Sequence, residues 1–155
     1  MCDTRQSCTE LELGSLRMIG ANVQDCLSVS GFKIAHILGK HFRSGEWGKR
    51  RCGSVITCVL DGRSLYARVD KFLKVDDDPC EGYASVTWFG YPEYPLGSPL
   101  VVRCRENQPD ELVDRFGCVL RLTQIDPSQV MVEREPGRVF CWMMRDSGFD
   151  TTVSS

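Results

Sequence analysis

Short apolar runs rich in β-branched and aromatic residues recur along the chain from residue 54 onwards, with turn-forming residues between them. Residues 54–60 and 64–75 are two such runs, and Asp61-Gly62 lies between them. This dipeptide favours a tight hairpin turn because glycine adopts positive φ without steric cost. We therefore predict a β-hairpin over this part of the chain.

Further strands are predicted after the hairpin, each bounded by a turn signal. They cover residues 83–89, 100–102, 119–125, 130–132 and 139–143. The segment 90–99 contains three prolines and two glycines, so it predicts a long loop, and residues 109–113 predict a single helical turn. Strands at spacings of about eight to twelve residues favour a sandwich or barrel over a parallel sheet.

The first third of the chain has a mixed pattern. Apolar residues recur at three-residue spacing at Leu13, Leu16 and Ile19, and a second apolar cluster spans residues 32–38. We predict one or two short helices over residues 11–38. The expected organisation is a loose tail at residues 1–10, an N-terminal extension with a basic connector at 11–51, a β domain at 52–146 and a second tail at 147–155.

Composition narrows the class of protein. The chain has 155 residues, of which 42% are hydrophobic and 26% charged, and this is ordinary for a folded domain. A formal net charge of −2 gives no global positive field of the kind that supplies non-specific nucleic-acid affinity. Nine scattered cysteines predict buried thiols and not a disulfide framework. With no signal-peptide pattern and no long apolar stretch, we expect a nuclear or cytoplasmic protein.

Three local patterns resemble the BAH (bromo-adjacent homology) domain, a distorted β-barrel found in chromatin proteins. Trp88 is followed four and five residues later by Pro92 and Glu93, as in that family. Residues 66–69 are similar to another family strand, and residues 116–120 together with 139–142 are similar to its closing strands. The resemblance implies a mainly β fold, a small distorted β-barrel with a short, partly helical N-terminal extension, and a protein-interaction function with a histone tail or other chromatin component as partner.

A weaker resemblance links the chain to the C-terminal accessory region of animal transposase-like proteins. It rests on residues 52–57, 62–66 and 144–148. It implies a transposon-derived family context and not a chemistry. The alternative function, a nucleic-acid-binding accessory domain of mobile-element origin, would use the basic segment at residues 40–51.

Some domains of the BAH type bind methyl-lysine in an aromatic cage, where ring faces attract the ammonium group. Trp88 matches the cage tryptophan, whereas Gly90 and Leu65 stand where the family pattern has aromatics, so Tyr66, Tyr91 or Tyr94 would have to substitute. The alternative interpretation is that Trp88 packs inside the barrel.

The loop at residues 90–97 is the second part of the predicted partner surface. It combines Tyr91, Glu93 and Tyr94 with prolines, which lower the entropy lost when a loop orders against a peptide. These residues, together with Trp88 and Tyr66, form the predicted partner-binding set. The alternative is a loop whose tyrosines lie flat on the barrel.

A basic segment is the basis of the nucleic-acid alternative. Its candidate residues are Lys40, Arg43, Trp47, Lys49, Arg50 and Arg51, with cations for phosphates and one indole for stacking on a base. Such a charge run is more often a solvated surface, and the overall charge balance is acidic. Steep salt dependence of DNA binding would distinguish this function from peptide binding.

Catalytic and metal-binding patterns are lacking in the sequence. No two cysteines have the spacing of a zinc motif, both histidines lie in the N-terminal extension, and no glycine-rich phosphate loop occurs. We therefore predict a binding module without catalytic residues, cofactor or metal, and not an enzyme.

Overall fold

The computed structural model describes residues 8–44, 55–79, 82–97, 101–128 and 130–143. Strands predominate in it, so the predicted mainly β fold is confirmed. The helical elements are α1 (Glu10–Met18), η1 (Cys26–Ser28), α2 (Asp110–Phe116) and η2 (Leu122–Gln124). The strands are β1 (Val29–Phe32), β2 (Ile34–Ile37), β3 (Lys40–Arg43), β4 (Val55–Leu60), β5 (Arg63–Val75), β6 (Tyr83–Trp88), β7 (Val102–Arg105), β8 (Val119–Arg121), β9 (Val130–Glu135) and β10 (Arg138–Met143).

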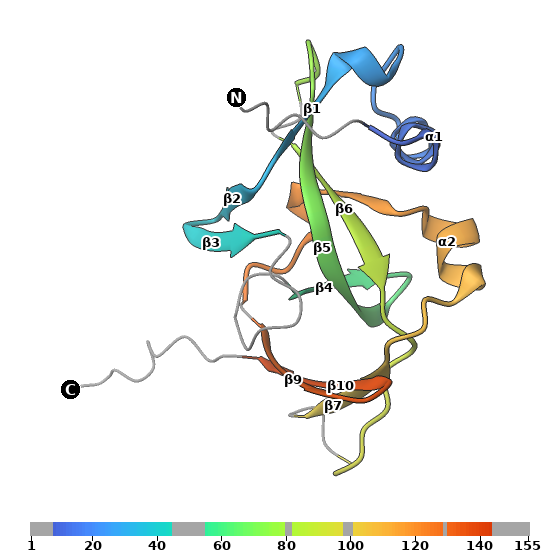
Figure 1. The fold of residues 1–155 in the computed structure, drawn as a ribbon. Coiled ribbons are helices and arrows are strands. Elements are labelled where there is room, and N and C mark those ends of the chain that lie inside the picture. Colours follow the sequence, from blue (N-terminus) through green and yellow to red (C-terminus); the bar gives the residue numbers. More distant parts are fainter. Residues whose placement is uncertain (1–7, 45–54, 80–81, 98–100, 129, 144–155) are drawn as a thin grey trace, which may run out of the picture.

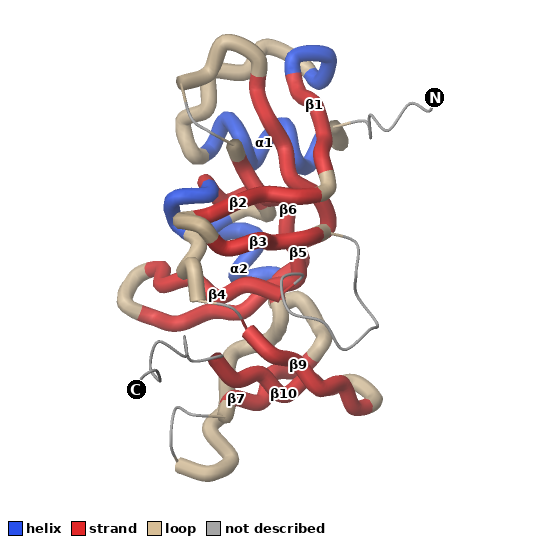
Figure 2. Tube along the Cα trace, turned by 90° about the vertical axis from the view of Figure 1, so that its left-hand side faces the viewer, coloured by secondary structure: helices blue, strands red, loops and turns tan. Residues whose placement is uncertain are grey.

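The long strand β5 organises the largest sheet. Its first half pairs with β4 and its last four residues pair with β1 along the same edge, while β6 pairs along the other edge and carries β8 beyond it. A second sheet has the order β7-β10-β9, and β2 and β3 form a separate hairpin. Figure 1 shows both α-helices on one side of the large sheet and the β2–β3 hairpin on the other, and Figure 2 gives the view from the hairpin side.

The predicted hairpin over residues 54–75 is present as β4 and β5. Asp61 and Gly62 form its turn with φ of 52° and 76°. These positive values are the ones expected for an Asp-Gly hairpin turn. The predicted helical turn near residue 110 is also present, as α2. Within the described residues the strand pairings form open sheets, and closure into a barrel stays a prediction.

The prediction of one or two short helices over residues 11–38 is confirmed by α1, but the second apolar cluster, at residues 32–38, is not helical. Residues 34–37 form β2, in which exposed and buried side chains alternate, and Leu38-Gly39 makes the turn into β3 with φ of 49° and 82°. Leucine is unfavourable at positive φ, so this turn carries no ordinary sequence signal. The strand predicted over 119–125 ends at Arg121, after which the chain forms η2.

Helix α1 begins with a capping box between Thr9 and Glu12. The Glu12 side chain also links the helix to the large sheet. Glu12 forms an ion pair with Lys71 of β5 (Oε1 to Nζ, 3.0 Å) and accepts a hydrogen bond from Ser85 of β6 at 2.5 Å. The pair is almost entirely buried, with side chains 7% and 12% exposed. The described part of the predicted extension is therefore fastened to the large sheet.

Three buried clusters form the core. One surrounds Trp88 and Phe42 between the large sheet, the β2–β3 hairpin and α2, and a second lies between α1 and the upper part of the sheet. The third joins the β7-β10-β9 sheet to Tyr66 and Phe89. Neither α-helix of the described chain is long and apolar enough to cross a lipid bilayer.

Candidate partner-binding surface

Trp88 is inaccessible to a partner. Its side chain is 0% exposed, and its Nε1–H donates a hydrogen bond to the carbonyl oxygen of Gly117 at 2.9 Å. Phe116 contacts the indole at a tilt, with ring centroids 6.4 Å apart. The expectation that Trp88 contacts a partner is therefore corrected, because a cage residue must present its ring face to the ligand. Its role is packing, the alternative that the sequence left open.

Tyr66 is also buried, so its expected role as a partner contact is corrected as well. The side chain lies in the third cluster with Phe89, Cys104 and Cys141. Burial, more than the nearby cysteines, raises the pKa of its hydroxyl to about 12. Tyr66 points to the opposite face of β5 from Leu65 and Ala67. All three residues are buried, because β5 is covered on both faces here.

The loop after β6 is held in place by backbone hydrogen bonds. Gly90 N–H donates to the Arg105 carbonyl at 2.8 Å, and Glu93 and Arg103 exchange two backbone bonds of 2.8 Å each. A Cβ at Gly90 would stand 3.3 Å from the Cβ of Arg105, so the close approach of loop and strand favours glycine there. The loop therefore presents its side chains from a defined backbone.

Register brings this loop beside the hairpin turn. Ala67 pairs with Trp88, and the next bond runs from Phe89 N–H to the Tyr66 carbonyl at 2.9 Å. Because the strands are antiparallel, continuing past Trp88 leads the loop toward the start of β5 and its turn. This is how two segments about 30 residues apart come to share one surface.

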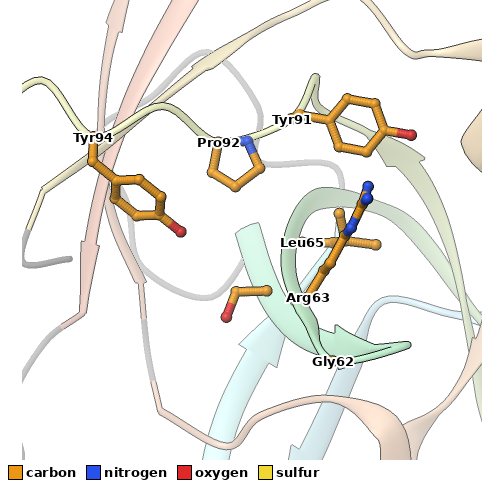
Figure 3. A pocket seen from close by; sticks show the side chains of 7 residues that line it. Gly62, Arg63, Leu65, Tyr91, Pro92 and Tyr94 are labelled. Atoms are coloured by element: carbon orange, nitrogen blue, oxygen red, sulfur yellow. The ribbon is translucent and has the colours of Figure 1, made fainter.

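The two segments enclose an open pocket of about 430 Å³, which we call the tyrosine pocket (Figure 3). Its lining residues are Gly62, Arg63, Ser64, Leu65, Tyr91, Pro92 and Tyr94. Tyr91 and Tyr94 flank Pro92 and are 37% and 47% exposed. Two of the five predicted partner residues therefore lie together at an accessible concave surface.

Tyr91 is fixed at its hydroxyl end. The hydroxyl donates a hydrogen bond to the carboxylate of Glu111, which lies in α2, and this bond raises the pKa of Tyr91. On the pocket side, the guanidinium of Arg63 lies over the ring, 5.6 Å from its centroid. The aromatic face and the cation are thus positioned against each other.

Glu93 is exposed but lies outside the tyrosine pocket. Its carboxylate pairs with the Arg103 guanidinium at 3.1 Å, and it does not line the tyrosine pocket. Its contribution is to hold the loop against β7. Glu93 as a partner contact stays a prediction.

Only the first part of the predicted nucleic-acid segment falls within the described residues. Lys40 and Arg43 lie at the two ends of β3, where the two-residue period puts Lys40 on the face of buried Phe42 and Arg43 on the opposite, exposed face. Trp47, Lys49, Arg50 and Arg51 lie outside the described residues. The described part therefore does not bring Lys40 and Arg43 onto one face.

The described cysteines whose side chains are placed are all buried free thiols: Cys8, Cys58, Cys104, Cys118 and Cys141. Burial raises the pKa of Cys58 to about 12, so its nucleophilic thiolate form is scarce at neutral pH. In the described ranges, no three histidine, cysteine or acidic residues are grouped closely enough to hold a metal ion.

Arg63, Ser64 and Leu65 are the pocket residues that sequence reasoning missed. They belong to the first half of β5, and nothing local distinguishes Arg63 from other strand arginines. The available signal was indirect: a tight turn at Asp61-Gly62 and a proline-rich loop that follows the neighbouring strand.

Comparison with known proteins adds no relative to this description. No protein-family model, no curated protein and no solved structure matches the chain.

Proposed function

We propose that this chain is a protein-interaction module that binds an extended peptide segment of a partner at the tyrosine pocket. The observation that carries the proposal is the pair of exposed tyrosines flanking a proline above an open pocket. Tyrosine is enriched in interfaces because it offers a large apolar ring, a polar end and little side-chain entropy to lose.

Preorganisation supports the same proposal. The loop is bonded to β7 through Gly90 and Glu93, and Tyr91 is held by Glu111. A surface that is already ordered loses less conformational entropy when a peptide binds. More of the contact free energy of a small pocket therefore contributes to affinity for the peptide.

A BAH-like barrel with a chromatin partner is the finer form of this proposal. It rests on the sequence patterns around Trp88 and residues 66–69. In this proposal, Trp88 supports the binding surface from inside and does not contact the partner. A DNA-binding function remains a prediction, and no observation in the described residues favours it.

The test is selection of random peptides on the purified chain, with histone-tail peptides included as a separate set. Selected peptides are then measured by fluorescence anisotropy against wild type and Tyr94→Ala. We expect at least about a tenfold loss of affinity, the scale expected for a residue at the centre of an interface. Leu27→Ala is the matched control, because Leu27 is a 91% exposed apolar residue that does not line the pocket.

Two results would overturn the proposal: no peptide is selected, or the selected peptides bind Tyr94→Ala as tightly as wild type. Thermal unfolding of each variant checks that the fold is retained. Trp88→Ala is unsuitable as a test, because truncating a fully buried tryptophan costs about 3–5 kcal/mol, a large fraction of the domain's stability, so a loss of binding would not report on the surface alone.

A further inference from the structure

Arg63 is the only lysine or arginine that lines the tyrosine pocket, and it has no ion pair in the described structure. Four other arginines of the described chain have carboxylate partners. These pairs are Arg68 with Asp70, Arg103 with Glu93, Arg115 with Asp61 and Arg134 with Glu106. Arg63 is therefore an exposed cation at a pocket, with no carboxylate satisfying it.

The charges around Arg63 explain why it stays available. Asp61, the nearest acid along the chain, is bound by Arg115 from α2. Glu111 lies at the far end of Tyr91 and accepts the hydrogen bond of its hydroxyl. Tyr91 contacts both groups: its hydroxyl bonds to Glu111, and its ring face lies against the Arg63 guanidinium at the pocket (Figure 3 shows Arg63 beside Tyr91).

The polar side chains of the pocket can all donate hydrogen bonds. Ser64 and Tyr94 contribute hydroxyls to the lining, and Arg63 contributes guanidinium N–H groups, whereas no carboxylate lines the pocket. A complementary ligand offers acceptors and negative charge. A methylated lysine offers neither, and its cation would be repelled by Arg63.

We propose that the tyrosine pocket selects peptides with an aspartate or glutamate side chain, whose carboxylate binds the guanidinium of Arg63. Tyr91, Pro92 and Tyr94 then pack against the neighbouring part of the peptide, and the hydroxyls of Ser64 and Tyr94 donate to its backbone carbonyls. Arginine suits this role because its planar fork binds a carboxylate through two parallel hydrogen bonds. The inference rests on the proposed function and specifies the chemistry of the partner.

The experiment begins with the tightest peptide from the selection and changes its acidic residue. Synthetic versions carry glutamate, glutamine, lysine, trimethyl-lysine or phosphoserine at that position. We expect the change from glutamate to glutamine to weaken binding about tenfold, a value between an exposed ion pair and a buried charged hydrogen bond. Lysine and trimethyl-lysine versions should bind more weakly still.

The matching change in the protein is Arg63→Gln. It should weaken binding of the glutamate peptide about tenfold and leave the glutamine peptide unchanged, because the two changes remove the same contact. Arg138→Gln is the control, since Arg138 is exposed and does not line the pocket. A charge reversal completes the set: Arg63→Glu should restore binding of the lysine peptide.

The outcomes separate the two proposals. If no peptide binds, the proposed function and this inference both fall. If peptides bind in a manner sensitive to Tyr94→Ala but glutamate and glutamine versions bind equally, only the acidic preference falls. Binding of the phosphoserine peptide without binding of the glutamate peptide would overturn the inference, because the pocket would then recognise phosphate.

Discussion

Replacement of Glu12 by alanine should be among the most damaging single changes outside the apolar core. The substitution removes the carboxylate that pairs with Lys71 at 3.0 Å and accepts the Ser85 hydrogen bond at 2.5 Å. It also removes the capping bond from the backbone N–H of Thr9 at 2.9 Å. Lys71, whose side chain is 12% exposed, would lose this counter-ion in a largely desolvated position.

The magnitude follows from that burial. Removing one partner of a buried ion pair costs about 3–5 kcal/mol, much of it the penalty for the charge left behind. The lost hydrogen bonds are part of the same figure, because they satisfy the same carboxylate. A domain of this kind has about 5–15 kcal/mol of total stability, so a large fraction would be lost.

Urea unfolding followed by circular dichroism measures the effect. With a urea dependence of about 2 kcal/mol per molar, Glu12→Ala should lower the midpoint by roughly 1.5–2.5 M. Glu10→Ala is the matched control: the same residue type, in the same first turn of α1, but exposed. It should change the free energy of unfolding by no more than about 0.5 kcal/mol.

Two further variants identify the cause. Glu12→Gln keeps a side chain of similar shape but removes the charge, so it should still destabilise through Lys71. A double-mutant cycle with Lys71→Met should give a coupling energy of about 1–3 kcal/mol. The reasoning would be refuted if Glu12→Ala cost less than about 1 kcal/mol, or as little as Glu10→Ala.

Three other predictions concern the core and its pH response. Gly117→Ala should lower the melting temperature by roughly 4–10 °C in differential scanning fluorimetry, because Gly117 has φ of 72° and a Cβ would lie 2.8 Å from the Ser15 hydroxyl. Gly137→Ala, at a φ of 74° but with open space around the Cβ, should cost only about 1 kcal/mol, and equal losses would contradict the steric argument. Trp88→Phe should cost about 1–3 kcal/mol in urea unfolding by leaving the Gly117 carbonyl without its donor, and a neutral result would contradict that hydrogen bond's role. Burial raises the pKa of Cys58 from 9.0 to about 12, so the folded state keeps a proton that the unfolded state releases; this stabilisation is complete below pH 9 and lost as pH rises toward 12. Unfolding free energies measured between pH 8 and pH 11 should therefore fall less steeply in Cys58→Ala than in wild type, and parallel curves would contradict the assignment.

Much of the secondary structure could be predicted from local sequence. The β4–β5 hairpin has a strong turn signal at Asp61-Gly62 between two β-rich runs, and β6, β9 and β10 follow similar runs. The β2–β3 hairpin could not be predicted, because Leu38 at its turn gives no signal and four-residue strands fit several periods.

The candidate site was predictable only in part, for a physical reason. Tyr91 and Tyr94 could be proposed because prolines and aromatics in a loop are a local property of the sequence. Trp88 and Tyr66 were also proposed from local sequence patterns, but they lie in strands and both are buried. Only the packing of α2 and of the β7-β10-β9 sheet over these strands decides which aromatic rings reach solvent.

The sequence by itself determined the class of fold, the main hairpin and the rigid aromatic loop, since these depend on residues close together in the chain. Tertiary structure decided what lies at the pocket. Arg63 meets Tyr91 only through the β5–β6 register, and Glu12 meets Ser85 across 73 residues. Such pairs arise from strand registration and helix docking, which balance contacts over the whole core, so no local pattern of residues specifies them.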